Sequence, residues 1–245
     1  MRSRFLTGFF TIIVSTIVLT LVALTLVAAT VQAKELRQST TNIAAKPTIA
    51  SARTILVFGD SLSASYGVPQ GQGWVALLEA KLAQKQSSKT TYKVVNASIS
   101  GETTSGGLTR FSAALATHKP NIVILELGAN DGLRGLPIAD MQSNLSQMIA
   151  QAKKTKAKVL LLGMKIPPNY GLKYNKTFTQ MYVNISKQYQ VTLVPFLLEG
   201  VAGKPELIQA DGLHPTAKAQ ARLLENVWKI FERMLSEMLN YKASL

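Results

Sequence analysis

The chain contains no cysteine and only two histidines, His118 and His214. The lack of thiols excludes disulfides, thiolate zinc sites, a cysteine nucleophile and a lipid-modified cysteine. Two histidines far apart in the sequence, with no cysteine beside them, argue against a zinc site. We therefore expect no metal and no other cofactor. The G-x-S-x-G nucleophile motif and the P-loop are absent as well.

Acidic residues are also scarce, since 13 aspartates and glutamates face 27 lysines and arginines, for a formal net charge of +14. This balance fits either a basic surface, as in exported proteins near anionic envelopes, or a nucleic-acid-binding protein. No recognition motif accompanies the charge, so we expect no nucleic-acid partner. The densest basic run, Lys153, Lys154, Lys156 and Lys158, ends a predicted helix, where cations interact favourably with the helix dipole.

A long uncharged run extends over residues 5–33 and follows Arg2 and Arg4. Its last residues, Val31-Gln32-Ala33, suit cleavage by a signal peptidase, so we interpret the run as a secretory signal peptide. The run is also long enough to cross about 30 Å of hydrocarbon, so a membrane anchor that is not cleaved is the competing interpretation. In either case the preceding arginines favour export of the remainder, to the periplasm or outside the cell.

The polar stretch after this run lacks apolar periodicity and predicts a flexible linker. The predicted organisation is a signal peptide or anchor over residues 1–33, a linker over residues 34–53 and one folded domain over residues 54–245.

Within that domain, short β-branched runs alternate with longer segments of helical period, and a hydrophobic content of 47% is enough for a core. The predicted strands are 54–58, 92–97, 121–127, 158–163 and 191–194. The predicted helices are 73–85, 104–117, 137–154, 173–190 and 216–240. Strands that are apolar throughout are buried on both faces, which is typical of parallel sheets. We therefore predict an α/β fold, a three-layer α/β/α sandwich with a central five-stranded parallel sheet.

Polar residues and glycines gather directly after the predicted strands, at the edge where such sheets bind ligands. Ser61 follows the first strand and can be a nucleophile, although a serine there can also simply cap a helix. Asp211 and His214 follow the fifth strand and can supply an orienting carboxylate and a base. The same pair can instead form an Asx-type turn without a chemical role. His118 ends a predicted helix, which is typical of a C-terminal cap at the opposite edge.

Two more residues after strands can stabilise an oxyanion. The N–H of Gly101 has no side chain in its way, and Asn130 has a carboxamide donor. With the N–H of Ser61 they can form a three-donor oxyanion hole. Each also has a simpler interpretation, as a turn glycine and a loop asparagine. We expect the neighbouring Asp60 and Asp131 to hold these loops rather than to react.

These residues stand in blocks that resemble the SGNH (GDSL) hydrolase family. The blocks are Gly59-Asp60-Ser61-Leu62, Gly101, Gly128-x-Asn130-Asp131 and Asp211-x-x-His214. The finer resemblance is to the bacterial periplasmic branch of thioesterase I, arylesterase and lysophospholipase, through residues 55–67, 130–135 and 166–171. One departure is Glu102, where an aspartate more often follows the glycine of the second block. We expect little effect, because the donor there is the backbone of Gly101.

The resemblance implies a flavodoxin-like sandwich with Ser61 as nucleophile, His214 as base and Asp211 as its partner. It also implies an oxyanion hole made by the N–H groups of Ser61 and Gly101 and the side chain of Asn130. The implied activity is hydrolysis of carboxylic ester or thioester bonds in small acyl substrates such as aryl esters, acyl thioesters and lysophospholipids. The alternatives are an SGNH-type acyltransferase or carbohydrate deacetylase, and a catalytically silent binding protein. We expect a monomer, whose basic C-terminal helix is a candidate for membrane-surface association.

Overall fold

The computed structural model describes residues 32, 34, 51–87 and 90–243. The chain divides into two compact units, Met1–Ile49 and Ala50–Leu245. The predicted signal peptide or anchor and nearly all of the predicted linker lie outside the described residues, so that part of the organisation stays a prediction. None of the helices built from described residues is long and apolar enough to cross a membrane.

Five parallel strands form one sheet, in the order β2-β1-β3-β4-β5. They are β1 (Ser51–Gly59), β2 (Thr90–Asn96), β3 (Ile122–Glu126), β4 (Lys158–Leu162) and β5 (Thr192–Val194). The predicted fold is confirmed, and each strand lies within a few residues of its predicted place. The first strand begins earlier than predicted, because Ser51 and the residues after it pair with β2 from Thr90 onward. All five residues of β3 are buried, as expected of a central strand covered on both faces.

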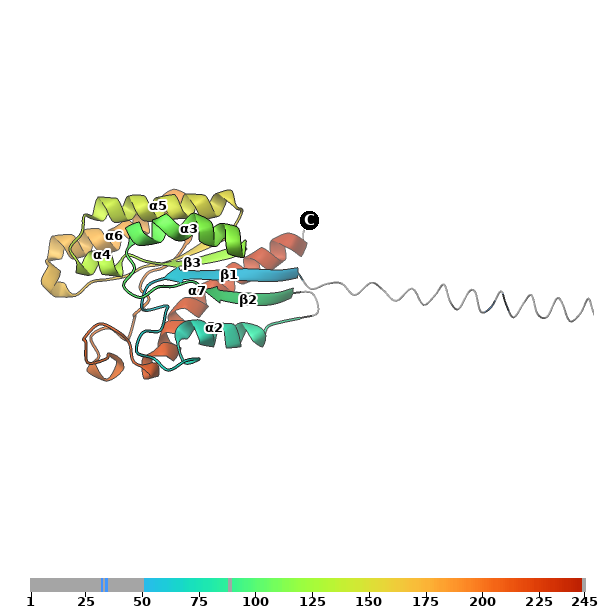
Figure 1. Ribbon diagram of the computed structural model, residues 1–245, viewed down its shortest axis with the longest axis horizontal. Helices are drawn as coiled ribbons and strands as arrows, with labels where there is room; N and C mark the ends of the chain where they lie inside the picture. Colours follow the sequence, from blue (N-terminus) through green and yellow to red (C-terminus); the bar gives the residue numbers. More distant parts are fainter. Residues whose placement is uncertain (1–31, 33, 35–50, 88–89, 244–245) are drawn as a thin grey trace, which may run out of the picture. The chain divides into compact units, whose positions relative to one another are not determined.

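Helices cover both faces of the sheet (Figure 1). One layer contains α3 (Thr104–His118), α4 (Ala129–Leu133), α5 (Ile138–Lys154) and α6 (Leu172–Tyr189), and the other contains α2 (Trp74–Ala83) and α7 (Gln220–Ala243). Short 3-10 helices occur at Pro168–Tyr170, Pro205–Leu207 and Ala217–Ala219. The predicted last helix therefore begins as a 3-10 turn and becomes an α-helix only at Gln220.

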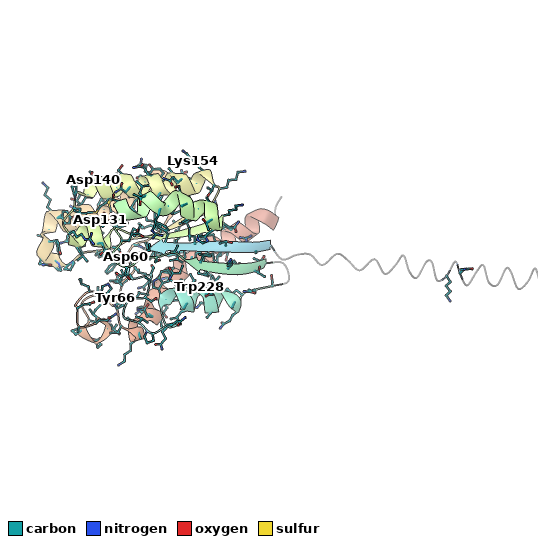
Figure 2. The ribbon with its side chains drawn as sticks, in the orientation of Figure 1. Asp60, Tyr66, Asp131, Asp140, Lys154 and Trp228 are labelled. Carbon is teal, nitrogen blue, oxygen red and sulfur yellow. The ribbon has the colours of Figure 1, made fainter. Side chains whose placement is uncertain are left out.

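The strand order reverses between β1 and β3, because β2 lies on the other side of β1. At such a point the connections leave the sheet in opposite directions, which opens a crevice at the carboxyl ends of the strands. Figure 2 shows Asp60, Tyr66 and Asp131 at this end of the molecule, with Lys154 at the other. The candidate residues after the strands therefore share one edge of the sheet, which we call the catalytic edge.

Candidate active site

The turn after β1 holds Ser61 in a well-defined position. Asp60 Oδ1 accepts the backbone N–H of Leu62 at 3.0 Å. Asn96, the last residue of β2, donates from Nδ2 to the carbonyl oxygen of Ser63 at 2.8 Å. Ser61 itself is nearly buried, with 9% of its surface exposed. The turn is thus fixed by its own aspartate and by the neighbouring strand.

Asp211 and His214 lie on a second turn, after β5. Asp211 Oδ1 accepts the backbone N–H groups of Leu213 and His214, both at 2.9 Å. Asp211 Oδ2 contacts His214 Nδ1 at 2.6 Å. The two backbone N–H groups, that of His214 foremost, lower the pKa of Asp211 to about 2, so its carboxylate stays ionised at neutral pH. The Asx-type turn and the contact with the imidazole are therefore made by the same side chain.

The two turns meet across the crevice, although 153 residues separate them in the sequence. His214 Nε2 lies 2.8 Å from Ser61 Oγ. Because the ionised Asp211 can only accept, His214 Nδ1 must carry a proton, and Nε2 is then free to accept one from the hydroxyl. The arrangement can activate a serine for nucleophilic attack. His118 lies at the far end of the 15-residue helix α3, about 20 Å from its start.

Backbone N–H groups are available beside the serine. Gly101 adopts a left-handed conformation with φ of 79°, and a Cβ on it would meet nothing within 4 Å. Within the described part of the chain, the N–H groups of Ser61 and Gly101 have no hydrogen-bond acceptor. Both can therefore bind an oxyanion without first losing another bond.

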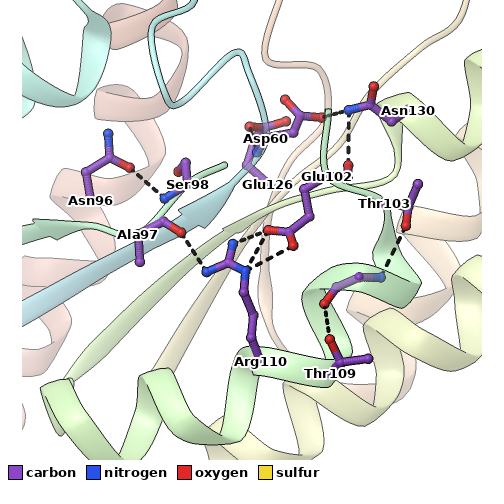
Figure 3. Close-up of polar contacts among 11 residues, drawn as sticks. Asp60, Asn96, Ala97, Ser98, Glu102, Thr103, Thr109, Arg110, Glu126 and Asn130 are labelled. Carbon is purple, nitrogen blue, oxygen red and sulfur yellow. Dashed lines mark hydrogen bonds and ion pairs between the residues drawn. The ribbon is translucent and has the colours of Figure 1, made fainter. Parts of the chain in front are cut away.

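Asn130, the third candidate donor, lies on the short helix α4. Its Nδ2 donates to Asp60 Oδ2 at 3.1 Å and to the carbonyl oxygen of Glu102 at 3.0 Å (Figure 3). Both amide hydrogens thus have acceptors, so Asn130 can reach an oxyanion only by sharing or exchanging one of these bonds. The two acceptors, Asp60 and Glu102, are next to Ser61 and Gly101 in the chain. The Asn130 amide therefore bridges the two loops that carry the backbone N–H donors.

Asp131 joins the loops that carry Gly101 and Asn130. It is buried, and its carboxylate accepts the backbone N–H of Thr104 at 2.9 Å and the Thr104 hydroxyl at 2.6 Å. Thr104 begins α3, three residues after Gly101, and Asp131 directly follows Asn130. A buried carboxylate with two such donors is a rigid link, so Asp131 holds the loops after β2 and β3 together.

The side chain of Glu102, where the sequence departs from the family pattern, is bound by Arg110. Its carboxylate forms an ion pair with Arg110, which also donates from Nη1 to the carbonyl oxygen of Ala97 at 2.8 Å (Figure 3). The Arg110 guanidinium lies 3.9 Å from the centre of the Phe58 ring. The side chain of Glu102 therefore anchors α3 to the end of β2, and only its backbone carbonyl contacts Asn130.

A second carboxyl behind Ser61 was not among the residues selected from the sequence. Glu126 ends β3 and is fully buried, and its Oε2 accepts the Ser63 hydroxyl at 2.8 Å and the N–H of Asp60 at 3.2 Å. A Cβ on Gly59 would lie 2.6 Å from that oxygen, so the glycine before Asp60 leaves room for the carboxyl. The available signal is a single charge in the otherwise apolar run IVILEL, because glutamate is seldom buried without a partner.

Comparison with known proteins agrees with this geometry. Residues 57–222 match the GDSL-like lipase/acylhydrolase family. The esterase TesA of Pseudomonas aeruginosa is 52% identical over 186 residues, 76% of this chain and 91% of that protein. Thioesterase 1/protease 1/lysophospholipase L1 of Escherichia coli K12 is 43% identical over 171 residues, 70% of this chain and 79% of that protein.

Solved structures are similar as well. A crystal structure of TesA superposes with a TM-score of 0.71 at 51% identity, and covers 74% of this chain and 99% of that chain. A structure of the psychrotrophic esterase EstA of Pseudoalteromonas, inhibited by monoethylphosphonate, gives a TM-score of 0.71 at 42% identity. The match covers 75% of this chain and 99% of that chain. The chain therefore belongs to the GDSL-like lipase/acylhydrolase family.

Proposed function

We propose that this serine esterase hydrolyses carboxylic ester or thioester bonds of acyl substrates through Ser61, His214 and Asp211. The observation that carries the proposal is the unbroken series of contacts from Ser61 Oγ to His214 Nε2 at 2.8 Å and from His214 Nδ1 to Asp211 at 2.6 Å. A nucleophile, a base and an orienting carboxylate in this geometry are what acyl transfer to a serine requires.

In the first half of the reaction, His214 Nε2 takes the proton of Ser61 as Oγ attacks the acyl carbonyl carbon. The negative charge that develops on the carbonyl oxygen is stabilised by the N–H groups of Ser61 and Gly101 and by Asn130. His214 then gives the proton to the leaving alcohol or thiol as the tetrahedral intermediate collapses to an acyl-enzyme. Water, activated by His214, attacks the acyl-enzyme by the same route and releases the carboxylic acid and free Ser61.

The proposed substrates have apolar acyl or aryl groups, because exposed apolar side chains follow the strands at the same edge of the sheet as the serine. The large hydrophobic residues that stay exposed in the described part of the chain are Tyr66, Ile99, Leu136, Leu172 and Leu213. Each follows a different strand, so all five belong to the catalytic edge. The Tyr66 ring lies 4.7 Å from that of His214. Exposed apolar groups at the edge that carries a reactive serine are typical of a site for an apolar ligand. Relatives of this chain are named arylesterase and thioesterase 1/protease 1/lysophospholipase L1.

We further propose that the protein is exported and acts as a monomer. Export is supported by the signal-like run over residues 5–33. Anchoring by that run and association of α7 with membrane surfaces stay predictions, which sedimentation of the full chain with vesicles would test.

The experiment is hydrolysis of p-nitrophenyl esters from acetate to palmitate by the full chain, beside Ser61→Ala. A fluorophosphonate probe reports the reactive serine. Ser112→Ala, at an exposed serine of α3, is the matched control. We expect Ser61→Ala to lose turnover and labelling while it stays folded, and Ser112→Ala to keep both. Near-normal turnover by Ser61→Ala would exclude the mechanism. Transfer of the acyl group to an added alcohol or sugar in preference to water would indicate an acyltransferase instead.

A further inference from the structure

Two carboxyl side chains lie side by side in the core behind Ser61. Asp60 and Glu126 are both fully buried. Asp60 follows β1, and Glu126 ends β3, where it pairs with Gly59. The N–H of Asp60 lies 3.2 Å from Glu126 Oε2, and the charges of the two carboxyl groups interact. Two adjacent carboxylates in a medium of low polarity cannot both ionise at neutral pH, because the repulsion adds to the loss of hydration. The pair therefore retains a proton.

The hydrogen bonds around the pair indicate which residue carries that proton. Asp60 accepts from the N–H of Leu62 at 3.0 Å and from Asn130 Nδ2 at 3.1 Å, and both bonds stabilise its ionised form. Glu126 Oε2 has two donors, but Oε1 is buried and has none in the described part of the chain. An ionised Glu126 would leave that oxygen unpaired, whereas a protonated one has a hydrogen to give to Asp60. Burial and the charge of Asp60 also raise the pKa of Glu126 well above its usual range.

The ionised Asp60 has a consequence for Asn130. A carboxamide can turn over and exchange its nitrogen and oxygen, and only the nitrogen end can stabilise an oxyanion. In this structure the nitrogen faces Asp60 Oδ2 and the carbonyl oxygen of Glu102, and both can only accept. The reversed amide would bring its oxygen against two oxygens. A protonated Asp60 would remove this preference, because its hydroxyl could donate to the amide oxygen.

We propose that Asp60 and Glu126 share one proton, carried by Glu126, and that the ionised Asp60 is a positioning residue that keeps the Asn130 nitrogen toward the oxyanion. This rests on the proposed function, since the orientation of Asn130 matters to turnover only if the amide binds that oxyanion. Asp60 touches no substrate atom and acts only through Asn130. Glu126 acts one step further away, by keeping Asp60 ionised in the core.

A double-mutant cycle tests the coupling between Asp60 and Asn130. Asn130→Ala should lower kcat about 10²–10³-fold, as expected for loss of one oxyanion donor. Asp60→Asn should lower kcat about 10–10²-fold with KM nearly unchanged, because a misplaced donor loses much of its effect. In the Asn130→Ala background, Asp60→Asn should lower kcat hardly further. A normal kcat for Asp60→Asn, or the same fold-change with and without Asn130, would overturn the proposal, since a merely structural role acts independently of that amide.

Glu126 gives a second test that does not depend on activity. The infrared difference spectrum of wild type minus Glu126→Gln at pH 7 should contain the C=O stretch of a protonated carboxyl. Only carboxylate bands in that spectrum would show that Glu126 is ionised and overturn the assignment.

A kinetic comparison of two Glu126 variants gives a third test. Glu126→Leu should lower kcat because Asp60 loses its donor, and Glu126→Gln should recover most of that loss because its amide donates to Asp60. Equal losses in the two variants would contradict the role of the proton.

These tests separate this inference from the proposed function. If Ser61→Ala keeps normal turnover, the esterase mechanism fails, while the infrared result still reports the proton. If wild type depends on Ser61 but the cycle is additive, the mechanism stands and the positioning role of Asp60 fails. If Asp60→Asn does not fold, the infrared spectrum and the Glu126 pair decide the question.

Discussion

Ser61 lies between two aspartates whose surroundings differ. Asp60 is fully buried behind it, whereas the Asp211 side chain, beyond His214, remains 37% exposed. Burial raises the pKa of Asp60 to about 6, and backbone N–H groups lower the pKa of Asp211 to about 2. The same residue type is therefore a stable anion on the open side of the serine and a member of a proton-sharing pair on the closed side. The comparison shows that burial and the donors facing a carboxylate together, rather than its distance from the nucleophile, decide whether it stays ionised.

The largest effect is expected on the open side, from Asp211→Asn. The amide could donate to His214 Nδ1, which favours the tautomer that has its proton on Nε2 and cannot accept from Ser61. We expect kcat to fall about 10³–10⁴-fold with the fold intact. The measurement is steady-state hydrolysis of a p-nitrophenyl ester beside Asp140→Asn, which changes an exposed aspartate in the first turn of α5. Similar activities in the two variants would mean that His214 needs no orienting carboxylate.

The next largest effect is expected on the closed side, in how the free energy of unfolding depends on pH. The folded-state pKa of Asp60 lies above the usual aspartate value of 3.8, so between about pH 4 and 6 the folded state binds more protons than the unfolded state. Stability due to Asp60 should therefore fall as pH rises through this window. A rise of the pKa from 3.8 to about 6 corresponds to about 3 kcal/mol. Urea unfolding at pH 4 to 7 should show wild type losing up to about that much relative to Asp60→Asn.

Asp211 should behave in the opposite sense, which sharpens the comparison. Its folded-state pKa lies below the usual aspartate value, so its contribution to stability is present above about pH 4 and is lost as pH falls toward 2. Asp211→Asn should therefore match the pH dependence of wild type from pH 4 to 7 and differ from it only in stronger acid. Parallel curves for the two aspartate variants across the whole range would show that their environments do not differ as described.

Most of the fold could be predicted from the sequence because its strands are apolar throughout and its long helices are amphipathic. Such patterns locate elements well and their ends less well. Helix α4, residues Ala129–Leu133, was missed because five residues make less than two turns and show no periodicity. Its start depends instead on Gly128, which has φ of 114° and approaches the hydroxyl of Tyr182 too closely to carry a Cβ.

The residues of the candidate site likewise fall into two groups, those that could be selected from the sequence and those that could not. Ser61, Gly101, Asn130, Asp211 and His214 could be selected from the sequence because each follows a predicted strand, and the ends of parallel strands converge. Glu126 stands out in the sequence only as a lone charge in an apolar strand, and its partners could not be predicted, because they depend on the register that sets Gly59 of β1 opposite Glu126 of β3. A contact between neighbouring strands leaves no spacing in the sequence from which to predict it. The hydrogen bonds of Asn130 to Asp60 and Glu102 likewise could not be predicted, because they depend on the positions in space of the loops after β1, β2 and β3.

The smallest effect is expected from Gly59→Ala, which probes the closed side without removing a charge. The new Cβ would lie 2.6 Å from Glu126 Oε2 and 2.9 Å from the Glu126 carbonyl oxygen, so the buried carboxyl or the strand must shift. We expect a loss of about 1–3 kcal/mol in the free energy of unfolding, as for overpacking in a core. Gly106→Ala is the control, since its Cβ would meet nothing closer than 3.4 Å in helix α3, where alanine is favoured over glycine. Urea unfolding of both variants gives the comparison. If Gly59→Ala were as stable as Gly106→Ala, the carboxyl of Glu126 would have room to move, and Asp60 would not be held by a fixed partner.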